Sequence, residues 1–367
     1  MADPLRALVV CGTRPDAIKL APVIHRLKQE SWIQTHVAAT GQHREMLAQV
    51  LDAFEIQVDE NFDVMPEKPD LAYLTSAILT RLDGLLAKVQ PHVVLAQGDT
   101  TTTFVASLAS FYRRIPFVHV EAGLRTSTVW LPFPEEFNRR ATSLVAALHF
   151  APTEWAADNL RREGVPEKDI FVTGNTSIDA LLHTLERVSA YQPPAEGRMI
   201  LVTTHRRENW GEPQRRIARA VKRILEQFPD TFAVVPMHRN PVVREVLTAE
   251  LNHERAFLVE PPAYPEFAAM MKASTLVLTD SGGVQEEAPS LGKPVLVLRE
   301  ETERPEGIEA GAAILVGTDP DAIFERASRL LQDEKAYEQM AKVRNPYGDG
   351  RAAERIVAAI RDRFASS

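Results

Sequence analysis

Charged and polar side chains gather directly after short β-branched runs of this chain. Six such clusters occur, at residues 12–15, 97–100, 121–125, 204–209, 237–240 and 280–283. The carboxyl ends of parallel strands meet at one edge of an open α/β sheet, and ligands bind along that edge. Capping and turn residues explain single members such as Thr13 or Ser281. They do not explain why His, Arg and Glu recur across the six positions, so we expect these clusters to form a shared site.

Several carboxylates lie in or beside the clusters of the first half, namely Asp99, Glu121 and Glu135 or Glu136. Carboxylates that face an anionic ligand repel it, so their presence indicates chemistry rather than binding alone. In a closed cleft their pKa values rise, and one carboxylate can accept a proton while another donates one. The alternative is a structural network of salt bridges with the neighbouring arginines, Arg125, Arg139 and Arg140.

Ser281, Gly282 and Gly283 stand before an expected helix at residues 284–291. Two glycines let a ligand approach the backbone closely, and the free N–H groups of a helix start favour a phosphate. Ser281 alone could be only a helix cap. Arg14, in the matching cluster of the first half, favours anion binding. His205 and His238 either bind phosphate, donate to a leaving oxygen, or are simply packed histidines.

Two common nucleotide motifs are absent from the Gly12-Thr13-Arg14-Pro15 turn, which has neither the Walker A pattern nor the dinucleotide fingerprint. ATP hydrolysis and NAD-linked hydride transfer are therefore not expected. Asp319-Pro320-Asp321 resembles a metal-binding pair of aspartates, but Pro320 suits the first turn of a helix. We interpret this segment as a helix start and expect no metal site.

Composition bounds the possible functions. A chain of 367 residues with 45% hydrophobic content predicts about two domains. The 50 acidic residues outnumber the 42 basic ones, and the net charge of -8 argues against nucleic acid as a partner. Cys11 is the only cysteine, and no apolar stretch is long enough to span a bilayer. With no signal peptide apparent, a cytoplasmic location is expected.

Short β-branched runs alternate with amphipathic stretches such as residues 19–30, 71–90 and 101–112. This alternation predicts an α/β fold of parallel sheets joined by crossover helices. The pattern weakens around residues 188–198 and then restarts, which indicates a hinge near residues 172–198. The last periodic segment begins at Ala352 and could pack on either half.

Several long motifs occur in one order along nearly the whole chain. They are Gly12-Thr13-Arg14-Pro15, Gln97-Gly98-Asp99-Thr100-Thr101-Thr102, His119-Val120-Glu121-Ala122-Gly123-Leu124-Arg125-Thr126, Pro132-Phe133-Pro134-Glu135-Glu136, His205-Arg206-Arg207-Glu208-Asn209, Asp280-Ser281-Gly282-Gly283-Val284-Gln285-Glu286-Glu287-Ala288 and Thr302-Glu303-Arg304-Pro305-Glu306. In these motifs the chain resembles the non-hydrolysing UDP-N-acetylglucosamine 2-epimerases.

The resemblance implies a glycosyltransferase-B-like architecture, in which two Rossmann-like domains close on UDP-GlcNAc in an interdomain cleft. The first would comprise residues 1–172, the second residues 173–351, and the helix at 352–367 would return to the first. The implied reaction removes the C2 proton of the sugar and expels UDP to give 2-acetamidoglucal. Re-addition of UDP then gives UDP-ManNAc. The resemblance also implies a homodimer and requires neither a redox cofactor nor a metal.

The resemblance assigns residues by position. Proton transfer falls to Asp99, Glu121 and Glu135, with His205 at the diphosphate as a further catalytic group. Substrate binding falls to Arg14, Lys19, Arg139, His238, Ser281, Gly282, Gly283, Glu287 and Arg304. A second, allosteric UDP-GlcNAc site is matched by Gln42, His43 and Arg206. The chain departs from the family pattern at Asp16, where Glu is expected, at Glu45, where Gln is expected, and at Lys68, where Arg is expected.

Three other functions fit parts of the pattern. A hydrolysing epimerase would release free ManNAc and UDP from the same intermediate. A glycosyltransferase would share the fold, but three carboxylates exceed the single base that sugar transfer needs. A non-catalytic UDP-sugar sensor would bind without turnover.

Overall fold

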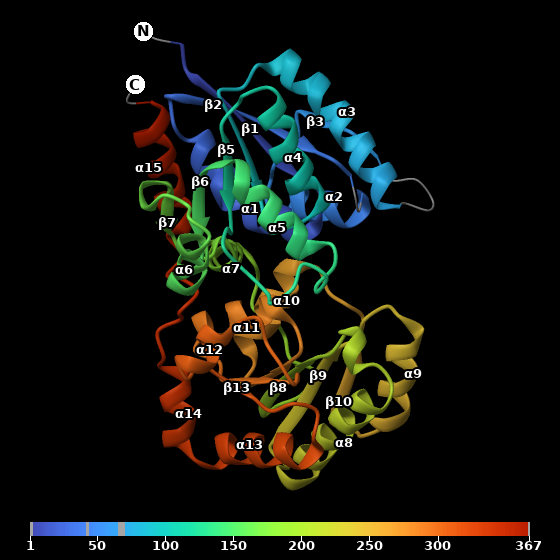
Figure 1. Ribbon diagram of the computed structural model, residues 1–367. Helices are drawn as coiled ribbons and strands as arrows, with labels where there is room; N and C mark the ends of the chain where they lie inside the picture. The colour runs from blue at the N-terminus through green and yellow to red at the C-terminus, as the bar shows by residue number, and fades with distance from the viewer. Residues whose placement is uncertain (1–2, 42–43, 65–69, 366–367) are drawn as a thin grey trace. The chain divides into compact units, whose positions relative to one another are not determined.

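The computed structural model describes residues 3–41, 44–64 and 70–365. The chain divides into two compact units. Unit 1 is Met1–His183 with Gly348–Ser367, and unit 2 is Thr184–Tyr347. Each unit is built on one parallel sheet with interleaved helices (Figure 1). The α/β class and the two parallel sheets expected from the alternating pattern are confirmed.

The sheet of unit 1 has the strand order β3-β2-β1-β4-β5-β6-β7, and every described pair is parallel. Its strands are β1 (Leu5–Cys11), β2 (Ile33–Ala39), β3 (Glu60–Asn61), β4 (Val93–Gln97), β5 (Phe117–Val120), β6 (Ala146–Ala151) and β7 (Ile170–Val172). Because β1, β4 and β5 are neighbours, the loops after these three strands open at the same edge of the sheet.

The helices of unit 1 are α1 (Arg14–Lys28), α2 (Arg44–Ala53), α3 (Leu71–Val89), α4 (Thr101–Tyr112), α5 (Glu135–Val145), α6 (Glu154–Arg162), α7 (Thr176–Arg187) and α15 (Ala352–Phe364), with a short 3₁₀ helix at Glu167–Asp169. Leu8 and Val10 of β1 pack in one core cluster with α3 and α4. Side chains alternate along a strand, so Ala7 and Val9 lie on the opposite face of the sheet. Helix α1 contacts β1 and also packs against α15, so the end of the chain completes this unit.

Unit 2 repeats the plan with the strand order β10-β9-β8-β11-β12-β13. Its strands are β8 (Arg198–Thr203), β9 (Thr231–Pro236), β10 (Ala256–Val259), β11 (Leu276–Thr279), β12 (Val295–Val297) and β13 (Ala313–Leu315). Its helices are α8 (Glu212–Gln227), α9 (Pro241–Glu250), α10 (Tyr264–Ala273), α11 (Gly282–Glu287), α12 (Pro305–Glu309), α13 (Pro320–Gln332) and α14 (Glu334–Ala341), with 3₁₀ helices at Arg207–Asn209 and Ala288–Leu291.

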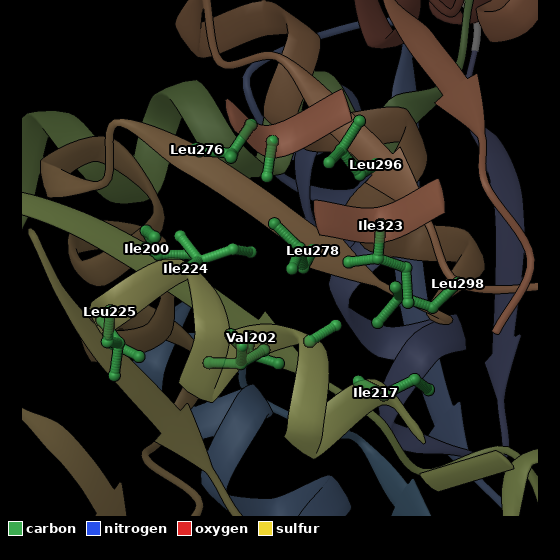
Figure 2. Close-up of a cluster of buried hydrophobic side chains, with 14 of the residues drawn as sticks. Ile200, Val202, Ile217, Ile224, Leu225, Leu276, Leu278, Leu296, Leu298 and Ile323 are labelled. Carbon is green, nitrogen blue, oxygen red and sulfur yellow. The ribbon is translucent and has the colours of Figure 1, made fainter. Parts of the chain in front are cut away.

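A buried, mostly aliphatic core holds unit 2 together (Figure 2). Val202 and Leu278 from the sheet meet Ile217 and Ile224 of α8 and Ile323 of α13. Burying such side chains contributes about 1.5–3 kcal/mol each. This core fixes the strand ends, and therefore the loops that follow them.

The structure corrects one expected helix and confirms another. The helix expected at residues 284–291 is a short α-helix, Gly282–Glu287, followed by the 3₁₀ helix Ala288–Leu291. Pro289 has no N–H to donate and disfavours a continued α-helix at this point. Asp319 caps α13 by accepting hydrogen bonds from the N–H groups of Asp321 and Ala322, as the helix-start interpretation predicted.

Two further observations concern the described part of the chain. No group of three or more His, Cys, Asp or Glu side chains there is arranged to hold a metal ion. None of the helices described combines the length and the apolar character needed to cross a membrane.

Candidate functional site

Asp16 joins the loops that follow β1 and β4 of unit 1. Its carboxylate completes a capping box with Thr13 at the start of α1. One carboxylate oxygen also accepts from the N–H of Gly12 (3.2 Å) and the hydroxyl of Thr100 (3.2 Å), beside Asp99. Burial raises the pKa of Asp16 to about 6, against the lowering effect of the hydrogen bonds from Thr13 and Gly12. Asp16, which departs from the family pattern, is therefore a buried residue that connects the loop after β1 to the loop after β4 by hydrogen bonds.

Glu121 accepts hydrogen bonds from three side chains of unit 1. It lies buried directly after β5, and its backbone is left-handed, with φ of 61°. Oε1 pairs with Nζ of Lys19 and accepts from Nδ2 of Asn175 (3.0 Å). Oε2 accepts from Nε2 of Gln97. The structure thus joins two predicted residues, Lys19 and Glu121, and adds Gln97 and Asn175, to which the sequence analysis assigned no role.

Asn175 was missed although a signal for it exists. It lies shortly after β7, as the other clusters lie after their strands. The segment Gly174-Asn175 carries no charged group, so residue type alone did not single it out.

Asp99 is paired with Arg139. Nε of Arg139 lies 2.9 Å, and Nη2 2.8 Å, from Oδ2 of Asp99. Asn138, also on α5, donates to the carbonyl of Asp99 (2.8 Å). One helix therefore holds both the backbone and the side chain of this carboxylate.

The structure separates Glu135 from Glu136. Glu136 is fully buried and accepts from Arg139 (2.7 Å) and Arg140 (2.8 Å). The structural salt-bridge interpretation is therefore right for Glu136. Glu135 is half-buried in the first turn of α5. Among the two, Glu135 is the candidate for proton transfer.

The loop after β8 in unit 2 is organised by Asp280, which is fully buried. Its carboxylate accepts from the N–H groups of His205 (2.9 Å) and Arg206 (3.0 Å) and from Nδ2 of Asn209 (3.0 Å). Burial opposes ionisation, but hydrogen bonding and charge from His205 and the backbone N–H groups outweigh it and hold the pKa of Asp280 below its usual value. Asp280 is an anionic anchor that sequence reasoning placed in the turn without assigning it this role.

Asp280 also orients His205. Nδ1 of His205 lies 3.0 Å from Oδ1 of Asp280, and the ring remains 40% exposed. This contact leaves Nε2 as the nitrogen available to a ligand. The ring of His238 stacks 6.1 Å away. Burial and the charge of His205 lower the pKa of His238, so His238 is more readily neutral than an ordinary histidine.

The Ser281-Gly282-Gly283 turn lies beside the guanidinium of Arg304 and has free space on one side. Ser281 occupies the N-cap position of α11, but its hydroxyl makes no capping hydrogen bond, so the interpretation of Ser281 as only a cap is not supported. A side chain at Gly282 would collide with the guanidinium of Arg304, with 2.5 Å between a Cβ and Cζ. At Gly283 nothing lies within 4 Å of such a Cβ in the described structure. The turn therefore has an open side at Gly283 and a guanidinium against Gly282.

Arg304 belongs to a network of ion pairs around Glu303. Arg304 contacts Glu286 (2.7 Å) and Glu303 (2.9 Å). Arg206 and Arg299 contact the same Glu303 at 3.2 Å and 2.5 Å. Burial opposes ionisation, but the arginines lower the pKa of Glu303 to about 2. The guanidinium groups are thus concentrated at the strand ends of unit 2.

The remaining predicted residues are placed as follows. Glu287 is buried and accepts from the hydroxyl of Tyr264 (3.3 Å). Arg14 is the first residue of α1. Of the allosteric candidates, Arg206 forms an ion pair with Glu303. Gln42 and His43 lie outside the described residues, and so do Lys68 and the side chain of Glu45.

Comparison with known proteins finds similarity over almost the full chain. A family model described as UDP-N-acetylglucosamine 2-epimerase matches residues 25–361. The UDP-N-acetylglucosamine 2-epimerase of Bacillus subtilis is 51% identical over 96% of this chain and 94% of its own length. The enzyme of the same name from Escherichia coli K12 is 47% identical over 98% of this chain and 99% of its own.

A solved structure gives the same result. The UDP-GlcNAc 2-epimerase of Neisseria meningitidis, bound to UDP-GlcNAc, has a TM-score of 0.91 and 44% identity, with 98% of this chain and 100% of that chain covered. The resemblance drawn from the motifs is thereby confirmed. The chain belongs to the UDP-N-acetylglucosamine 2-epimerase family.

Proposed function

We propose that this chain interconverts UDP-GlcNAc and UDP-ManNAc without hydrolysis. The observation that carries the proposal is that the two units hold different polar groups. Unit 1 holds carboxylates that can transfer protons, and unit 2 holds donors that can bind a diphosphate. The relative from Neisseria meningitidis, which is bound to UDP-GlcNAc, supports the choice of substrate.

The proposed reaction conserves atoms and electrons. A carboxylate accepts the proton at C2 of the sugar, and the electron pair left on C2 forms the C1=C2 bond as the C1–O bond to UDP breaks. UDP then returns to C1, and C2 is protonated on the other face. Asp99, Glu121 and Glu135 share this proton transfer. Lys19 and Arg139, each paired with one of these carboxylates, also face the substrate.

UDP is held mainly by unit 2 in this proposal. Ser281 and the Gly282-Gly283 backbone donate to the diphosphate, and Nε2 of His205 donates to the leaving oxygen. Arg304, His238 and, from unit 1, Arg14 supply further contacts. Glu287 accepts from the ribose hydroxyls. The proposed chemistry needs no metal or redox cofactor.

Solvent deuterium tests the reaction directly. UDP-GlcNAc incubated with the protein in D2O is expected to gain deuterium at C2 and to equilibrate with UDP-ManNAc. Free ManNAc at every turnover would indicate the hydrolysing reaction instead. UDP-GlcNAc binding with no exchange would indicate a sensor, and transfer to an added acceptor would indicate a glycosyltransferase.

We also propose that the chain forms a homodimer through an apolar surface on α4, α5 and the loop before α5. This surface comprises Phe111, Tyr112, Trp130, Leu131, Phe133, Phe137 and Leu144, all of them exposed. Trp130 is 73% and Leu144 87% exposed. Exposed apolar side chains that form one patch are typical of interfaces. Helices α4 and α5 contact each other, so their exposed side chains can form one continuous face.

Sedimentation analysis tests the dimer. The wild type is expected at twice the chain mass, and Leu144→Asp is expected to shift it toward the monomer. A monomeric wild type would contradict the proposal. A cytoplasmic location is also part of the proposal, and cell fractionation tests it.

A further inference from the structure

Glu121 is held by three donors of two different kinds. Lys19 brings a charge on a flexible stem, whereas Gln97 and Asn175 bring neutral amides. An amide is a useful probe of orientation, because one side can only donate and the other can only accept.

The orientation of the Asn175 amide is determined by its own loop. Oδ1 of Asn175 accepts from the backbone N–H of Ser177 (3.0 Å). Nδ2 must therefore point the other way, toward Oε1 of Glu121, at 3.0 Å. Asn175 is 2% exposed, so no solvent-facing alternative is available to its side chain.

The loop that carries Asn175 is held on both sides. The N–H of Thr173 donates to the carbonyl of Ala151 at the end of β6 (3.0 Å). Arg355 of α15 donates to the carbonyl of Thr173 (2.9 Å). A Cβ at Gly348 would lie 3.4 Å from the backbone nitrogen of Asn175, so the returning chain also packs closely here. The donor that meets Glu121 is therefore positioned by the sheet and by the carboxyl-terminal segment.

These contacts use the two oxygens of Glu121 unequally. A carboxylate oxygen has two acceptor sites. On Oε1 one site receives Lys19 and the other receives Asn175. On Oε2 the described residues supply one donor, Gln97, which leaves one site open. The open acceptor site of Glu121 is thus on Oε2.

We infer that Asn175 is a positioning residue that saturates Oε1 of Glu121, so that Oε2 is the oxygen that exchanges the proton with C2 of the sugar. The inference rests on the proposed function. When Glu121 acts in the elimination, Oε2 accepts the proton from C2. When Glu121 acts in the re-addition, a protonated Oε2 donates the proton to C2. Asn175 itself never touches the reacting atoms.

Two substitutions at Asn175 separate positioning from simple loop support. Asn175→Asp is isosteric and retains an acceptor for the Ser177 N–H, but it replaces the donor toward Glu121 with a second carboxylate oxygen. Asn175→Ala removes both hydrogen bonds. Ser177→Ala is the matched control, since it keeps the backbone N–H and its hydroxyl has no partner among the described residues.

The readouts are kcat and KM for epimerisation, the rate of deuterium entry at C2, and the Kd of UDP measured by calorimetry. Misplacing a reacting group lowers the rate by about tenfold to a hundredfold. We expect kcat and deuterium entry to fall by about this factor in Asn175→Ala and by at least as much in Asn175→Asp, with the Kd of UDP within about twofold of wild type. Ser177→Ala should behave like the wild type.

The outcomes are distinguishable. If Asn175→Asp keeps the wild-type kcat while Asn175→Ala does not, Asn175 only supports its loop, and the inference is overturned. Asn175→Ala remains decisive if Asn175→Asp does not fold, since a wild-type kcat in folded Asn175→Ala also overturns it. If the wild type shows no deuterium entry at C2, the proposed function fails before any variant is compared.

Discussion

Glu121 shows how much a single backbone position contributes to this site. A non-glycine residue in the left-handed region costs about 1–3 kcal/mol, and such strain persists only where surrounding contacts determine it. Here Lys19, Gln97 and Asn175 provide those contacts. The residue type and the position after a strand were readable from the sequence. The left-handed φ and the three donors were not, because they depend on loops that are far apart along the chain.

Asp16 gives a prediction with a defined pH window. Its pKa is raised from 3.8 to about 6 chiefly by burial, so the folded protein binds this proton more tightly than the unfolded chain. The resulting stability is present below about pH 4 and is lost as the pH rises through about 6. The stability of the wild type relative to Asp16→Asn should therefore fall by roughly 2 kcal/mol between pH 4 and pH 7.

Urea denaturation at a series of pH values measures this difference. The difference in the free energy of unfolding between wild type and Asp16→Asn cancels the contributions of the titratable groups that both proteins contain. A wild-type advantage that grows with rising pH would show that Asp16 is not a buried acid of raised pKa.

Gly283 gives a second prediction at the residue scale. Because nothing in the described structure lies within 4 Å of a Cβ built there, Gly283→Ala should leave the melting temperature within about 2 °C of wild type. If the diphosphate occupies that open side, the same substitution should weaken UDP binding by about tenfold, or 1.4 kcal/mol. Thermal unfolding and calorimetry with UDP measure the two effects.

Gly282→Ala is the comparison for this test. Its Cβ meets the Arg304 guanidinium, so Arg304 must move before any ligand arrives. UDP affinity that is unchanged in Gly283→Ala would exclude the diphosphate from that side of the turn.

At the scale of elements, helix boundaries were predicted well where a local signal exists. The stretch expected at residues 101–112 is α4, capped by Thr100, and Asp319 caps α13. The helix after Ser281 was predicted too long, because the break at Pro289 produces a 3₁₀ turn rather than a simple end. Local signals therefore located some helix starts but not the conformation of the last turn, and α1 begins at Arg14, before the expected residue 19.

Helix α15 provides a prediction at this scale. Asp179 of α7 accepts from the N–H groups of Ala352 (3.2 Å) and Ala353 (2.8 Å), so a residue far away in sequence caps the last helix. Asp179→Ala should destabilise unit 1 by about 1 kcal/mol, the usual effect of losing a helix cap. Asp319→Ala, which removes the exposed cap of α13 in unit 2, is the matched control.

Hydrogen exchange resolved by peptide measures both variants. Protection should fall in α15 and α1 for Asp179→Ala, and in α13 for Asp319→Ala. Loss of protection in α13 alone for both variants would contradict the capping role of Asp179.

On the scale of the whole molecule, the chain crosses between its units twice. Unit 2 is one continuous segment, Thr184–Tyr347, whereas unit 1 needs Gly348–Ser367 in addition to Met1–His183. Ile356 and Ile360 of α15 are fully buried, so a unit 1 without this helix exposes apolar surface.

Fragment expression tests this asymmetry. Residues 184–347 should fold alone and bind UDP, with lower affinity than the full chain. Residues 1–183 should aggregate, and fusion of residues 348–367 to them through a short linker should restore solubility. Circular dichroism and calorimetry report the result, and a well-folded 1–183 fragment would show that α15 is dispensable.

The sequence by itself determined the class of fold and the family, and it predicted the sheet edge at which function concentrates. Strand and helix periods are local properties, and motifs such as Gln97-Gly98-Asp99-Thr100 are read directly from residue order. Only the tertiary structure decided which side chains meet. Lys19 and Glu121 are 102 residues apart, and Asn175 and Glu121 are 54 apart. A hydrogen bond requires its two atoms to be placed to within a few tenths of an ångström. That placement comes from strand order and from the packing of loops against distant helices, which no local pattern encodes.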